Sequence, residues 1–193
     1  MSDNIENHLT LTQKYIILLL SANNNQPITG KVWFQKELFL VSQNLPQLEE
    51  ETEFEGSLMG PFSENANAEL DQLRIEGLVD LNGKIKLTSE GQKVAVRLHL
   101  RTSEQTKELL SDMKSFINDL SEDEMLAFVY FSYPEMTEES IEFERIKERR
   151  TEIAISLFRK RKVSVGKAAL IAGLSQEDFI RKAQANGISV FSE

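Results

Sequence analysis

The sequence predicts a mainly α-helical protein in three parts. We expect a winged-helix domain with a small β-hairpin over residues 1–95, a helical extension over residues 96–143, and a helix-turn-helix domain over residues 144–193. Three observations predict this order. Three helical patterns precede an Asn-Gly hairpin signal, a long stretch without Pro or Gly follows, and the tail holds two short helical patterns around a glycine turn.

Two helices open the first domain. Residues 9–21 carry the apolar surface of a helix, with Thr12 as a candidate N-cap. After an Asn-rich break, Thr29 is the candidate cap of a second helix over residues 30–42. The glutamates that follow Pro46 predict an acidic loop.

A short strand, a turn and a third helix come next. Residues 54–59 predict the strand, and Gly60-Pro61 predicts the turn. Ser63 is the candidate cap of a helix over residues 64–76, and Gly77 suits its end because that position often needs a positive φ.

The hairpin is the clearest local signal of the first domain. Asn82-Gly83 separates the apolar runs 78–81 and 84–87, and both turn residues tolerate positive φ. Thr88 is the candidate cap of the helix after it. A hairpin directly after a third helix is the order of a winged helix.

One helix is predicted to run through residues 92–120. Leu109, Met113, Phe116 and Leu120 form a stripe that needs a partner. We favour packing on the first domain, with a helix–helix dimer as the alternative.

The middle of the chain predicts two further helix starts. Ser121-Glu122-Asp123-Glu124 is a capping box for a helix that ends at Pro134. Thr137 is the candidate cap of a charged helix, in which residues 142–152 contain pairs of opposite charge three positions apart.

The tail combines a basic run with two short helical patterns. Ser164 can cap the first helix, Gly173 can end it, and Ser175 can cap the second. Residues 144–193 carry 11 basic and 6 acidic residues, whereas residues 1–143 are acidic. The tail is therefore the part expected to attract nucleic acid.

The candidate DNA contacts in the tail divide by their chemistry. Basic side chains suit phosphates, and these are Arg159, Lys160, Arg161, Lys162, Lys167 and Lys182. Side chains along the second helix suit base edges, and these are Ser175, Gln176, Glu177, Arg181 and Gln184. The alternative is a helix pair that only packs on a neighbour, with the basic run favoured by the dipole at a helix end.

The predicted third helix of the first domain is a poor DNA reader by charge. It carries four acidic residues against Arg74, and only Lys84 and Lys86 on the wing are basic support. We therefore expect the winged-helix domain to bind protein rather than DNA.

Composition argues against several other classes. The chain has no Cys and only two His, and it shows no metal-ligand spacing, phosphate loop or nucleophile motif. We expect no catalytic residues, metal or cofactor, and hence no enzyme. No apolar run approaches a membrane span, so we expect a cytoplasmic protein.

Two resemblances extend this interpretation. The segments VSVGKAALIAGLSQEDF and NGI, within residues 153–188, resemble a family of small UPF-type uncharacterised proteins described as predicted antitoxins with a helix-turn-helix. The segments KVWFQKELFLVSQ and GPFSENANAELDQLRIEGLVDLNGKIKLTSEG, within residues 9–95, and YFSYPEMTEES at residues 130–140, look like a Panacea-type or phage-associated winged helix. Both resemblances imply an antitoxin role.

Two functions are consistent with these patterns. The first is a DNA-binding transcriptional regulator of antitoxin type, expected as a homodimer, whose tail contacts DNA while the acidic N-terminal region binds a partner protein or self-associates. The alternative is a protein-interaction module that neutralises a toxin without binding DNA.

Overall fold

The computed structural model describes residues 5–188 and divides into two compact units. Unit 1 comprises Met1–Glu55 and Pro61–Asp119, and unit 2 comprises Gly56–Gly60 and Leu120–Glu193. The described residues are mainly helical, with two small two-stranded sheets. Within these residues, no helix has both the length and the apolar character that crossing a membrane requires.

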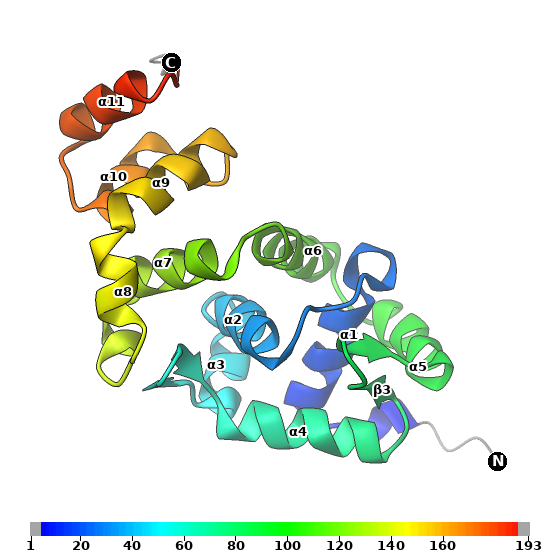
Figure 1. Cartoon of the computed structure of the whole chain (residues 1–193). Coiled ribbons are helices and arrows are strands. Elements are labelled where there is room, and N and C mark those ends of the chain that lie inside the picture. The colour runs from blue at the N-terminus through cyan, green and yellow to red at the C-terminus, as the bar shows by residue number, and fades with distance from the viewer. Residues whose placement is uncertain (1–4, 189–193) are drawn as a thin grey trace. The chain divides into compact units, whose positions relative to one another are not determined.

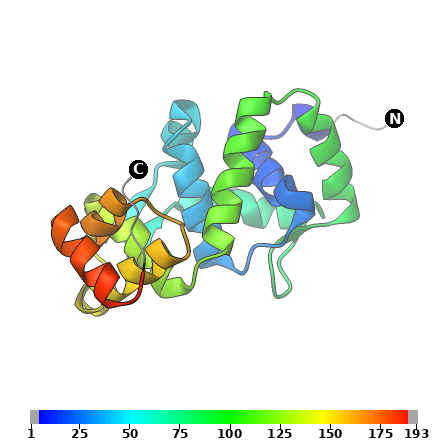
Figure 2. The ribbon, with the colours of Figure 1, turned by 90° about the horizontal axis from the view of Figure 1, so that it is seen from above.

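Unit 1 is built around its first long helix. Its helices are η1 (Ile5–Asn7), α1 (Leu11–Asn25), α2 (Lys31–Ser42), α3 (Pro46–Thr52), α4 (Glu64–Ile75), α5 (Ser89–His99) and α6 (Glu104–Asn118). Helix α1 packs against α3, α4, α5 and α6 (Figures 1 and 2). Its apolar side chains supply the centre of the core.

The first helix starts differ from the sequence prediction. Thr10, not Thr12, caps α1: its hydroxyl accepts from the Gln13 backbone N–H, and the Gln13 side chain accepts from the Thr10 backbone. Helix α2 starts after Gly30 with no side-chain cap, so Thr29 is not its cap.

The prediction of an acidic loop after Pro46 is also wrong. Most of these glutamates lie in α3, which begins at Pro46 because proline at the first helical position already has a suitable φ.

The helix predicted after Ser63, which is α4, and the hairpin predicted at Asn82-Gly83 are both present. The Ser63 hydroxyl accepts from the Ala66 N–H at the start of α4. Strands β3 (Val79–Asp80) and β4 (Lys86–Leu87) are antiparallel, and the bridge Ile28–Ile85 joins the hairpin to the segment before α2. Of the two turn residues, Gly83 has the positive φ, +78°.

Gly60 and Pro61 do not form the predicted turn but lie in β2 (Gly60–Phe62), which pairs with β1 (Glu55–Ser57). Two neighbouring side chains of α2 hold the chain after Gly60. The Gln35 amide bonds both the N–H and the C=O of Ser63, and the Lys36 ammonium donates to the Pro61 carbonyl at 3.0 Å. Lys36 is buried, so this contact replaces water at its charge.

The helix predicted over residues 92–120 is two helices, because α5 ends at His99 and α6 starts after its cap, Ser103. The inward stripe of α6 is shifted by one position from Leu109 and Met113: Leu110, Lys114 and Ile117 are the buried residues. The Lys114 ammonium donates to three carbonyls at the end of α1, at 2.9–3.0 Å. Lys114, on the buried face of α6, thus caps the C-terminal end of α1.

Unit 2 contains α7 (Glu122–Ser132), η2 (Pro134–Thr137), α8 (Phe143–Glu148), α9 (Arg150–Arg159), α10 (Val165–Ala172) and α11 (Gln176–Ala185). The capping box of Ser121 and Glu124 is confirmed. Thr137 lies in η2 and caps no α-helix, and the charged segment divides into α8 and α9 at Arg149.

Candidate nucleic-acid interface

The last three helices of unit 2 pack around small and aromatic side chains. Helix α10 contacts α7, α9 and α11, and its residues Ala168, Ala169, Ile171 and Ala172 are buried. The rings of Phe158 on α9 and Phe179 on α11 meet edge to face at 5.6 Å. Small residues on α10 let its neighbours approach closely, and the aromatic pair fixes α11 to α9.

The turn between α10 and α11 depends on Gly173 and on Arg150. Gly173 has φ +70°, and a Cβ atom there would lie 2.7 Å from the Arg150 guanidinium. Arg150 donates to the Ile171 and Leu170 carbonyls at 2.6 and 2.9 Å, and it lies 4.0 Å from the centre of the Phe131 ring. Arg150 therefore satisfies the end of α10, and a side chain at residue 173 would displace the Arg150 guanidinium.

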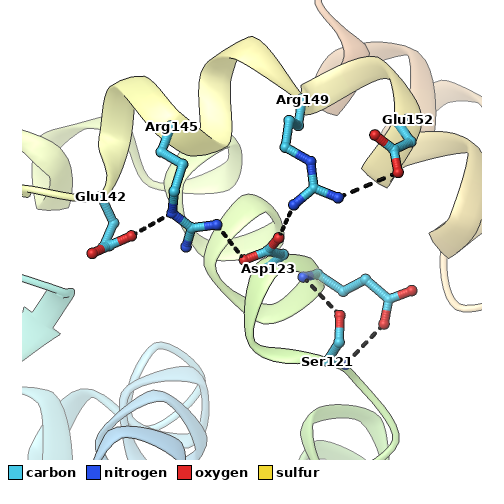
Figure 3. A network of polar contacts seen from close by, with 7 residues as sticks. Ser121, Asp123, Glu142, Arg145, Arg149 and Glu152 are labelled. Atoms are coloured by element: carbon cyan, nitrogen blue, oxygen red, sulfur yellow. Dashed lines mark hydrogen bonds and ion pairs between the residues drawn. The ribbon is translucent and has the colours of Figure 1, made fainter.

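Asp123, in the first turn of α7, binds two arginines that precede α9 in the chain or lie at its start (Figure 3). It accepts from Arg145 at 2.7 Å and from Arg149. Glu142 also pairs with Arg145, at 2.6 Å, and Glu152 with Arg149, at 3.3 Å (Figure 3). These carboxylates compensate both guanidinium charges within unit 2.

Glu124 engages one of the predicted phosphate ligands. Its carboxylate accepts from Lys160 and from the Ser156 hydroxyl at 2.7 Å each, and from the Ser121 N–H at 2.8 Å. Burial alone would raise the pKa of Glu124, but these hydrogen bonds hold the pKa below its ordinary value. Lys160 is thus bound to a buried carboxylate.

Two more predicted ligands are engaged inside the unit. Lys167 lies 5.2 Å from the centre of the Phe128 ring, and burial lowers its pKa. Arg181 pairs with Asp178 at 2.5 Å, one turn away on α11. Both side chains would have to leave these contacts to bind a phosphate.

Three of the remaining predicted cations face an open hollow at the end of α9. Arg159, Arg161 and Lys162 line it with Ser164, the cap of α10, and its volume is 670 Å³. Arg159 makes one long hydrogen bond, 3.5 Å, to the Asn186 carbonyl. In the described part of the chain neither Arg159 nor Arg161 pairs with a carboxylate, and the structure therefore brings uncompensated cations together here.

The second helix presents a mixed surface. The Ser175 hydroxyl is held by Asp178, accepting from its N–H at 3.1 Å and donating to its carboxylate at 2.7 Å. Gln176, Glu177, Lys182 and Gln184 are exposed, and Lys182 pairs with no carboxylate among residues 5–188. The four charged residues of α11 balance, so the helix itself is neutral.

The two wing lysines lie apart from this group in sequence and belong to unit 1. Lys86 pairs with Asp80 across the β3–β4 hairpin at 3.4 Å, while Lys84 is exposed at the hairpin loop. The β3–β4 hairpin therefore offers one compensated and one exposed cation.

The roles of Arg150, Asp123 and Glu124 were not predicted from the sequence. The capping box identified Glu124 as the start of a helix, but nothing in the spacing connects it to Lys160, 36 residues later. Arg150 lies in a charged stretch where its contact with α10 has no local signal. Residues 5–188 contain no group of three side chains suited to hold a metal ion.

The family comparison concerns this part of the chain. Residues 128–192, which run from within α7 to beyond α11, match the model of an uncharacterised protein family, UPF0175. The match agrees with the UPF-type resemblance predicted for the tail and does not reach residues 1–127. Curated proteins gave no match, and neither did solved structures.

Proposed function

We propose that α10 and α11 form a helix-turn-helix that binds DNA, and that the chain is a regulator of antitoxin type. The observation that carries this proposal is the hollow lined by Arg159 and Arg161, whose charges no carboxylate of residues 5–188 compensates. Positive side chains gathered beside a helix start suit the DNA backbone, which supplies most non-specific affinity.

In this proposal the predicted ligands have different roles. Arg159 and Arg161 contact phosphates directly, with Lys182 as a further cation on α11. Lys160 and Lys167 keep their internal contacts and stabilise the unit instead. Base edges are read by exposed side chains of α11, namely Gln176, Glu177 and Gln184.

Unit 1 has a different part in this proposal. Its acidic helix α4 and the β3–β4 hairpin form a winged helix of Panacea type, which binds a partner protein or a second copy of the chain. A homodimer would place two short reading helices on one DNA site, which is how such helices gain specificity.

The test uses the full chain and a labelled mixed-sequence duplex, with anisotropy measured over a series of salt concentrations. The variant is Arg159→Gln with Arg161→Asn, since asparagine tolerates the positive φ of residue 161 (+56°) better than most residues. The matched control removes two exposed charges from unit 1, Arg74→Gln with Lys93→Gln.

Loss of two phosphate contacts lowers the slope of log K against log salt by about 2, at roughly 0.9 per contact. We expect this change in the tail variant and not in the control. Equal slopes for wild type, variant and control would exclude the hollow as a phosphate site.

A protein-interaction module without DNA binding is the second candidate. It is favoured by Glu177 and Asp178 in the first turn of α11, because two acidic side chains at the start of a reading helix are repelled by the negative charge of DNA. Absence of duplex binding at low salt by the wild-type chain would support this candidate.

A further inference from the structure

A second hollow lies in unit 1, far along the chain from the candidate DNA contacts. It is bordered by η1, α1 and the corner between α5 and α6, and its volume is 430 Å³. Pockets that hold small molecules measure about 300–1,000 Å³. The hollow therefore has room for a small organic molecule.

The floor of this hollow is apolar. Leu18 and Leu98 are buried members of the unit 1 core, and the Tyr15 ring packs against the same core. Burial raises the pKa of the Tyr15 hydroxyl, so this group remains a hydrogen-bond donor at neutral pH. Such a floor suits a hydrocarbon or aromatic body.

The rim of the hollow is positively charged. Lys14 and Arg101 line it, and the Arg101 guanidinium donates to the neutral amide of Asn7 at 3.1 Å. The carboxylate in the wall, Glu6, is paired with Arg97 at 2.9 Å. The lining of the hollow thus holds two cations and one carboxylate, and that carboxylate is already paired with Arg97 outside the lining.

This positive rim contrasts with the rest of unit 1. Residues 1–119 carry 18 acidic and 11 basic residues. Lys14 pairs with no carboxylate in the described chain, unlike Lys31, Lys86 and Lys93 of the same unit. Arg101 lies in the field of Glu6, so Lys14 contributes the larger share of the excess positive charge. A net positive rim over an apolar floor is suited to a ligand that has an acidic group and an apolar body.

We propose that this hollow binds a small organic anion, with the acidic group between Lys14 and Arg101 and the apolar body against Leu18, Leu98 and Tyr15. The Ser103 and Thr106 hydroxyls, which bond each other at 2.9 Å, lie at the rim and supply further polar contacts. The ligand belongs to the class of monocarboxylates or monophosphates with a ring or short chain.

The test is a titration of the full-length ¹⁵N-labelled protein, followed by amide chemical shifts. Phenyl phosphate and benzoate are the anionic probes, benzyl alcohol is the neutral probe of similar size, and inorganic phosphate lacks the apolar body. We expect saturable shifts at residues of the hollow with an anionic ring compound, at about millimolar Kd or tighter. The neutral ring and inorganic phosphate should each bind at least about tenfold more weakly. The more strongly binding anionic probe then identifies the acidic group as phosphate or carboxylate.

The variant Lys14→Gln with Arg101→Gln should weaken the anionic probes by at least about tenfold, a loss of about 1.4 kcal/mol. The matched control, Lys84→Gln with Lys93→Gln, removes two exposed cations of the same unit and should bind like wild type. Equal binding of benzyl alcohol and phenyl phosphate by wild type would overturn the proposal without any variant. So would shifts that spread over the surface without saturating.

Discussion

Replacing Lys36 by methionine should stabilise unit 1 at mildly acidic pH. The side chain is 2% exposed, and its ammonium has one hydrogen bond, to the Pro61 carbonyl. Burial lowers the pKa of Lys36 from 10.5 to about 7. The charged form is therefore disfavoured in the folded state, whereas methionine fills similar space without a charge.

The size of the effect follows from this pKa. At ~1.4 kcal/mol per pH unit, the fall from 10.5 to about 7 corresponds to about 5 kcal/mol for holding the proton in the folded state. Methionine leaves the Pro61 carbonyl without its donor, at a cost of about 1–3 kcal/mol. The variant should therefore be about 2–4 kcal/mol more stable than wild type near pH 6.

The pH dependence has a definite sign. The folded-state pKa lies below the unfolded value, so the unfolded chain binds more protons between pH 7 and 10.5, and Lys36 makes wild type more stable as pH rises. From about pH 6 to 9 this contribution is about 3 kcal/mol, and the variant lacks it. The advantage of methionine should shrink by that amount.

Urea unfolding at these two pH values measures the difference, with fluorescence of Trp33, the single tryptophan, reporting on unit 1. The nearby buried Glu37 has a raised pKa and titrates in the opposite sense, so the comparison is between variant and wild type at each pH. Lys93→Met, at an exposed position of α5, is the control. If Lys36→Met changes stability equally at both pH values, the ammonium is not desolvated and the reasoning fails.

Two further predictions concern unit 2. Gly173→Ala should lower the free energy of unfolding by about 2–4 kcal/mol, measured by thermal unfolding with circular dichroism, because alanine is strained at a left-handed φ and its Cβ displaces Arg150. The control Gly187→Ala, at φ +74° with open space around it, should lower the free energy of unfolding by only about 1–2 kcal/mol. Equal losses of stability in the two variants would refute the role of Arg150. Glu124→Gln should destabilise the unit at neutral pH by releasing Lys160. Because the pKa of Glu124 is lowered, the wild-type advantage should be complete above the ordinary carboxyl pKa of 4.5 and should decline as pH falls below it, and an advantage that did not change with pH would contradict the ion pair.

Local signals predicted much of the secondary structure. Ser63, Ser121, Ser164 and Ser175 each cap the helix that the sequence assigned to them, because an N-cap is decided by residues within one turn. The Asn82-Gly83 hairpin formed for the same reason. The prediction of Thr12 as a cap failed because Thr10, two residues earlier, is an equally plausible cap. The prediction of Thr29 failed because α2 uses no side-chain cap.

Tertiary contacts explain what the sequence did not reveal. The stripe of α6 that begins at Leu109 is the more apolar one in sequence, yet packing buried the neighbouring stripe, which begins at Leu110 and contains Lys114. A lysine on a buried face contradicts simple patterning, and the free carbonyls at the end of α1, together with the buried carboxyl of Glu37, account for it. In the candidate DNA site, likewise, spacing identified the cations but not which of them a distant Asp or Glu had already bound.

The uneven compensation of charge in unit 2 has a consequence for how it would meet a polyanion. Residues 120–193 hold more acidic than basic residues, yet Arg159 and Arg161 leave one end uncompensated. An approaching polyanion then favours the orientations in which this positive end leads. This orientation acts only within a Debye length, about 8 Å at physiological ionic strength. Rising salt would then first slow the encounter, before it weakens the complex once formed.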